Sequence, residues 1–162
     1  MDSIATRENI KGSVEPWKKA ERLEKQWQYN YEHISLVTKK RKRNFKKEYN
    51  RMVTKAALEE AAAMYGITLM EFSFGDDYQH VHLLVNVPNT LKIVQVIQIL
   101  KSHSASIIFE KMPGFRKLYP RGSFWGFQYS NCSVGPTNYK KIIDYIRRQD
   151  ISTVLPQRRL FN

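Results

Sequence analysis

Two histidines separated by one residue are the side chains of this chain best spaced for metal chemistry. His80 and His82 lie in residues 80–87, whose apolar and β-branched composition predicts a buried strand. Side chains alternate between the two faces of a strand, so both imidazoles point the same way and Val81 points to the opposite layer. Such a pair can bind one divalent metal ion. The alternative is that both are ordinary strand histidines satisfied by hydrogen bonds.

A second reactive pair lies near the end of the chain. Tyr145 and Gln149 are four residues apart in residues 138–149, a helical pattern, and therefore share one helix face. A phenol with a pKa of about 10 is a poor nucleophile, but it can attack a phosphodiester whose charge a metal ion stabilises. Two imidazoles and one amide oxygen suit Mg²⁺ or Mn²⁺, and they leave positions for phosphate oxygens. Most of the nine tyrosines are expected to pack or cap instead.

The order of the predicted elements gives the fold class. Strands are expected at residues 33–38, 67–74, 80–87 and 124–134, and helices at residues 45–65, about 90–111 and 138–149, with a loop at 113–122. This β-α-β-β-α-β order followed by a helix is the ferredoxin-like, or split βαβ, pattern of an α+β protein. It predicts an antiparallel sheet with helices on one face, plus a C-terminal catalytic helix. We expect a partly helical N-terminal extension (residues 1–28), one domain (29–151) and a tail (152–162).

Charge and composition favour a polyanionic partner. The chain has 27 Lys and Arg against 15 Asp and Glu, a formal net charge of +12. An excess of this size favours nucleic acid or an anionic membrane. No apolar run approaches the roughly 18 residues of a membrane span, and no signal peptide is recognised. The single Cys132 excludes an internal disulfide and a cysteine-cluster zinc site. We expect a cytoplasmic protein.

Cations gather in two places. Residues 39–51 hold eight cations, which we expect to be exposed because unpaired charges are expensive to bury. They form either a solvated loop or a surface that contacts phosphates. A second cluster, near residues 115–125, mixes cations with aromatics, of which Tyr119 and Trp125 are expected to stack on bases, while Phe127 and Tyr129 are expected in the core. The candidate DNA-binding residues are Lys39, Lys40, Arg41, Lys42, Arg43, Lys101, Arg116, Lys117 and Arg121.

These motifs together resemble the single-tyrosine HUH transposases of small insertion sequences, where HUH stands for His-hydrophobe-His. The matching segments are His33 to Lys39, Gln79 to His82, Leu100 to Ser102 with Ser104, Trp125 to Tyr129, Ser133 to Gly135, and Tyr145 with Gln149. The resemblance implies that His80, His82 and Gln149 bind Mg²⁺ or Mn²⁺ and that Tyr145 is the nucleophile. The family commonly has Asp where this chain has Gln79, and Asp77 can supply a carboxylate near the metal instead. His33 is expected to be structural.

The resemblance also implies an activity and partners. Such enzymes cut single-stranded DNA at insertion-sequence ends, form a covalent 5′-phosphotyrosine, leave a free 3′-hydroxyl, and rejoin strands without ATP. They recognise DNA hairpins and act as homodimers in the prokaryotic cytoplasm, at the nucleoid when bound to DNA. Their strands join into one sheet, and the tyrosine helix of one subunit can complete the metal site of the other.

Other function classes stay open on the sequence. One is a related HUH nickase of replication or plasmid transfer, or a domesticated relative of the transposases. Another is a noncatalytic RNA-binding module of the same fold, which predicts exposed aromatics on the central strands. Here the central strand carries His80 and His82 instead.

Overall fold

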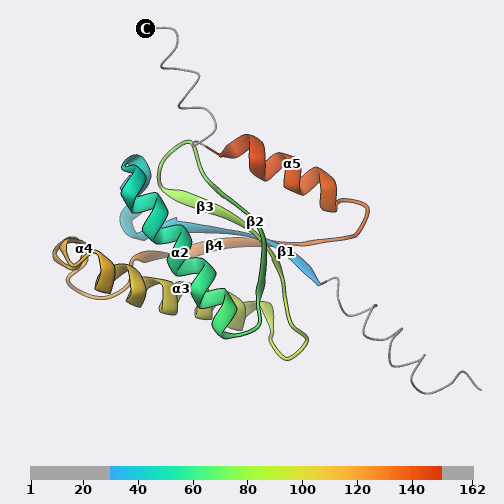
Figure 1. The fold of residues 1–162 in the computed structure, drawn as a ribbon, viewed down its shortest axis with the longest axis horizontal. Helices are drawn as coiled ribbons and strands as arrows, with labels where there is room; N and C mark the ends of the chain where they lie inside the picture. Colours follow the sequence, from blue (N-terminus) through green and yellow to red (C-terminus); the bar gives the residue numbers. More distant parts are fainter. Residues whose placement is uncertain (1–29, 151–162) are drawn as a thin grey trace, which may run out of the picture.

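A four-stranded antiparallel sheet forms the centre of the computed structural model, which describes residues 30–150. Its strands are Tyr31–Thr38 (β1), Thr68–Phe74 (β2), His80–Asn86 (β3) and Trp125–Val134 (β4), in the order β2-β3-β1-β4 (Figure 1). The helices are Glu48–Met64 (α2), Ile93–Lys111 (α3), Gly114–Leu118 (α4) and Tyr139–Gln149 (α5), with 3₁₀ turns at Lys39–Arg41 (η1) and Asn44–Lys46 (η2). The ferredoxin-like prediction is confirmed. The helix expected before residue 30 lies outside the described residues.

The alternation of side chains along β3 divides the molecule into two layers. Val81, Leu83 and Val85 are buried in the main core with residues of α2 and α3. Leu84 faces the opposite way and packs with Val134 and with Ile146 of α5. Figure 1 accordingly shows α2 and α3 on one side of the sheet and α5 on the other. Because His80 and His82 share the parity of Leu84, they lie on the face that α5 covers.

The helices begin later than predicted, and one was missed. The first residues expected to open α2 form the separate turn η2, and α3 begins only after Lys92, whose backbone N–H donates to Oε1 of Gln95 at 2.8 Å. The segment expected to be a loop contains α4, which follows Pro113, a residue with helical φ of −57°. No helix among residues 30–150 is both long and apolar enough to cross a membrane.

Arg51 corrects the expectation that all cations of residues 39–51 are exposed, because it is buried beneath η2. Its Nη1 donates hydrogen bonds to the carbonyl oxygens of Phe45, at 2.6 Å, and Lys46, at 2.9 Å. Two charge-assisted hydrogen bonds offset the cost of burying the guanidinium. Arg51 therefore holds the turn that links β1 to α2.

We predict that Arg51→Met lowers the free energy of unfolding by about 2 kcal/mol, since it leaves two buried carbonyls without their donor. Urea denaturation followed by the fluorescence of buried Trp125 measures the change. Lys55→Met, one turn further along the exposed side of α2, is the matched control and should change stability by less than about 0.5 kcal/mol. Equal losses in both variants would contradict the capping role.

Candidate active site and nucleic-acid surface

His80 and His82 turn their Nε2 atoms toward each other on the α5 face of the sheet. The two nitrogens are 3.0 Å apart, and the ring planes are nearly perpendicular, at 86°. Two ligands at right angles around a cation, each bound at about 2.1 Å, are separated by about 3.0 Å. The pair therefore has the spacing of two neighbouring ligands of one metal ion.

Asp77 and Gly75 fix the position of the His80 ring. Nδ1 of His80 donates to Oδ1 of Asp77 at 2.7 Å, so Nε2 carries the lone pair that a metal needs. A Cβ on Gly75 would lie 2.1 Å from Cε1 of His80, which means that only glycine leaves room for the ring there. Asp77 thus occupies the place suggested for a carboxylate beside the site, although Gln79 stands at the family's usual position.

His33 on β1 contacts the other imidazole, a role that the sequence did not suggest. Its Nε2 lies 3.2 Å from Nδ1 of His82. When His82 donates this hydrogen bond, its own Nε2 is free to bind a cation. Burial, together with the neighbouring His80 and His33, lowers the pKa of His82 to about 4, which keeps its imidazole neutral at neutral pH. Only the register of the two strands reveals this contact. His33 pairs with Leu84, which follows His82 by two residues and therefore lies on the same face of β3.

Tyr145 lies beside these histidines, whereas Gln149 has no contact with them. The Tyr145 ring centroid is 5.8 Å from that of His82 and 6.0 Å from that of His33, and the side chain is 40% exposed. Gln149 is half-buried one turn further along α5 and makes no hydrogen bond to another described residue. In residues 30–150 no three His, Cys, Asp or Glu side chains are grouped to hold a metal. A third protein ligand would therefore come from an amide such as that of Gln149.

Helix α5 is attached at two points directly after the tyrosine. Ile146 is fully buried against Leu84 and Val134, and Nε of Arg147 donates to Glu71 on β2 at 2.8 Å. These contacts place one face of the helix on the sheet and hold Tyr145 at the histidines. The arrangement brings a phenol and two imidazoles to a partly exposed surface.

The two basic clusters form one surface. Lys39 Nζ donates to the carbonyl of Arg121 at 3.4 Å, and Lys42 Nζ donates to the carbonyl of Leu118 at 3.2 Å. The segment after β1 therefore lies along the segment that leads into β4. Lys40, Arg41, Arg43, Arg116, Lys117 and Arg121 are exposed there, and none makes an ion pair with another described residue. Such a surface suits a phosphate backbone.

The expectation that Tyr119 and Trp125 stack on bases is wrong, because their side chains are only 2% and 1% exposed. Tyr119 accepts a hydrogen bond from Asn44, and Trp125 Nε1 donates to Ser104. Phe127, expected in the core, is 97% exposed, and Tyr129 is 43% exposed. The pairing of β4 is irregular next to these residues: between the pairs Leu36–Tyr129 and Thr38–Trp125, β1 has one residue and β4 has three.

Comparison with known proteins agrees with this geometry. Residues 25–149 match the family model described as "Transposase IS200 like". The chain belongs to this transposase family. A candidate transposase from Deinococcus radiodurans R1, solved at 1.90 Å, matches with a TM-score of 0.57 and 23% identity, over 74% of this chain and 90% of that one. A REP-associated tyrosine transposase bound to a REP hairpin matches with a TM-score of 0.50 and 10% identity, over 74% and 65%. No curated protein matches the sequence.

Membership in the IS200-like family makes the protein a transposase, and the two structures share its fold. A transposase acts on DNA.

We predict that Gly75→Ala weakens Mn²⁺ binding at least 10-fold, because the added methyl group displaces the His80 ring from Asp77. Isothermal titration calorimetry with Mn²⁺ measures the affinity. Gly114→Ala is the matched control, since a Cβ there meets nothing within 4 Å. An unchanged Mn²⁺ affinity in Gly75→Ala would contradict the hypothesis that His80 binds the metal.

Proposed function

We propose that this transposase cleaves and rejoins single-stranded DNA with Tyr145 as its nucleophile. The observation that carries the proposal is the position of Tyr145 beside two imidazoles whose Nε2 atoms are 3.0 Å apart. A phenol alone at neutral pH is a weak nucleophile. Next to a pair of nitrogens with the spacing of metal ligands, it lies where a phosphodiester could be activated.

His80 and His82 would hold Mg²⁺ or Mn²⁺, and Gln149 would add an amide oxygen. Asp77 and His33 support this role, because each contacts the Nδ1 atom of one ligand and so leaves its Nε2 for the cation. When bound, the cation draws negative charge from the scissile phosphate and leaves coordination positions for its oxygens.

In the proposed reaction Tyr145 attacks the phosphodiester, and the covalent bond that it forms keeps the free energy of the bond that is broken. Oη of Tyr145 loses its proton and forms a bond to phosphorus, while the bond from phosphorus to the 3′ oxygen breaks. That oxygen takes up a proton and leaves as a 3′-hydroxyl, and the 5′-phosphate remains on the tyrosine. The reverse attack by a 3′-hydroxyl restores a phosphodiester, so no external energy source is required.

The DNA partner we propose is a single strand that carries a hairpin. The basic surface formed by residues 39–43 and 116–121 would contact the hairpin backbone. The similar REP-associated transposase bound to a REP hairpin supports this choice. Lys101 lies apart on α3, where its Nζ donates to the carbonyl of Phe127.

A homodimer would form along the outer edge of β4, with Tyr145 acting on its own chain's histidines. Within residues 30–150 no strand pairs with that edge, and a long unpaired edge is a template for a second chain. The short distance between the Tyr145 and His82 rings of one chain favours sites in cis over exchange of α5 between subunits.

We predict that Tyr145→Phe abolishes the covalent protein–DNA adduct, because the nucleophilic oxygen is missing. Labelled single-stranded insertion-sequence ends with Mg²⁺, followed by denaturing gels, measure adduct formation. Tyr139→Phe removes a hydroxyl from the same helix and should retain the adduct. Wild-type protein with EDTA should form none, and an adduct in Tyr145→Phe would exclude this nucleophile.

We predict that mixing Tyr145→Phe with His82→Ala protein restores no adduct, since sites in cis leave each chain lacking one component. Sedimentation of the mixture, before the labelled DNA is added, establishes that mixed dimers exist. An adduct on the His82→Ala chain would instead reveal that the tyrosine helix is exchanged between subunits.

A further inference from the structure

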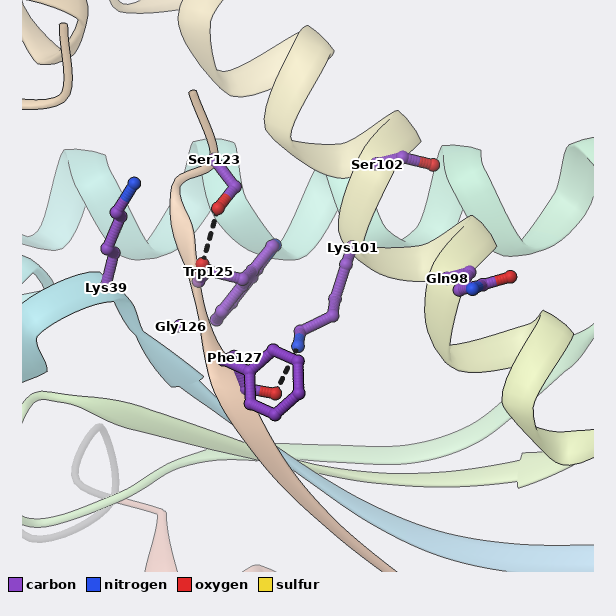
Figure 2. Close-up of a pocket in the computed structure, with 8 residues that line it drawn as sticks. All are labelled: Lys39, Gln98, Lys101, Ser102, Ser123, Trp125, Gly126 and Phe127. Carbon is purple, nitrogen blue, oxygen red and sulfur yellow. Dashed lines mark hydrogen bonds between the residues drawn. The ribbon is translucent and has the colours of Figure 1, made fainter. Parts of the chain in front are cut away.

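A cavity of about 480 Å³ lies between α3 and the start of β4, on the face of the sheet opposite the histidines. Its walls include Lys39, Gln98, Lys101, Ser102, Trp125 and Phe127 (Figure 2). The lining contains two lysines and no carboxylate. The cavity is therefore separate from the tyrosine site and has the charge to attract an anion.

The bulge in β4 positions Phe127 at this cavity. Three residues of β4, Gly126 to Gln128, stand opposite Val37 alone, so the strand bends outward there. Gly126 makes this possible, because a Cβ on it would lie 3.3 Å from the carbonyl oxygens of Val37 and Thr38. The Phe127 side chain is 97% exposed, whereas the neighbouring Trp125 is buried. An aromatic ring held out from a rigid strand is suited to stacking.

Lys101 joins the aromatic part of the cavity to its charged part. Its Nζ reaches from α3 to the carbonyl of Phe127 at 3.2 Å (Figure 2). The same Nζ lies 5.4 Å from the centre of the Tyr129 ring. Lys39 lines the other side, next to the exposed Arg121. Cations on both sides of an exposed ring are the arrangement that takes an unpaired base with its phosphates.

We propose that this cavity binds one unpaired nucleotide of the DNA strand, with the base stacked on Phe127 and the flanking phosphates near Lys39 and Lys101. The inference rests on the proposed single-stranded substrate and adds a contact remote from the scissile bond. A double-stranded segment does not fit this role, because its bases are already stacked. The nucleotide bound here lies outside the cleavage site, on the opposite face of the sheet.

The test compares fluorescein-labelled (dT)₁₂ with an abasic 12-mer, which keeps the phosphates and lacks the bases. Anisotropy titrations in EDTA measure binding without cleavage. Wild-type protein should bind (dT)₁₂ about 5- to 100-fold more tightly than the abasic strand. Phe127→Ala should lose most of that difference, and Phe127→Tyr should keep it. Lys101→Gln should reduce the slope of log affinity against log salt by about 0.7.

Met64→Ala, which truncates an exposed side chain at the end of α2, is the matched control and should behave like wild type. An unchanged preference for (dT)₁₂ in Phe127→Ala would overturn the proposal. Sedimentation without DNA then measures whether Phe127→Ala still self-associates. If it does not, and the preference for (dT)₁₂ is unchanged, the cavity is covered by a second subunit instead of a nucleotide. Absence of a tyrosine adduct would defeat the proposed chemistry but leave these binding results standing.

Discussion

The row of close polar contacts from Asp77 through His80 and His82 to His33 is the interaction on which the site depends. Successive distances of 2.7, 3.0 and 3.2 Å connect a turn, strand β3 and strand β1. Asp77 contacts Nδ1 of His80, and His33 contacts Nδ1 of His82, so the two Nε2 atoms face each other. Because strand pairing fixes β1 against β3, the imidazoles do not have to be ordered when a ligand arrives. The low pKa of His82 follows from the same crowding and keeps it neutral.

The sheet also positions Tyr145, through the apolar packing of α5. Leu84 follows the histidines on the same face of β3 and forms a small core with Val134 and Ile146. That core positions α5, and the ion pair between Arg147 and Glu71 limits rotation about it. Tyr145 stands next to Ile146 in the helix, so the apolar contact that attaches the helix also sets the position of the phenol. Catalytic geometry and packing are therefore coupled through one pair of neighbouring residues.

Local periodicity was enough to predict the sheet and the long helices, and the resemblance to the HUH transposases placed Tyr145 with His80 and His82. It failed where a contact depends on register or on a bulge. The contact of His33 with His82 arises from strand pairing that no local pattern records. Phe127 is exposed although strict alternation counts it with the buried Trp125, and it lies where β4 has two extra residues against β1. Arg51 is buried because the η2 carbonyls need a donor, and this need is visible only once the turn is formed.

Strand β4 connects the two faces of the molecule. Its regular part, near Cys132, lies beside His33 on the tyrosine side, whereas its bulged part opens toward α3 and the cavity. The bulge at residues 126–128 lies between these two parts, so one strand contributes both to the sheet beside His33 and to the wall of the cavity.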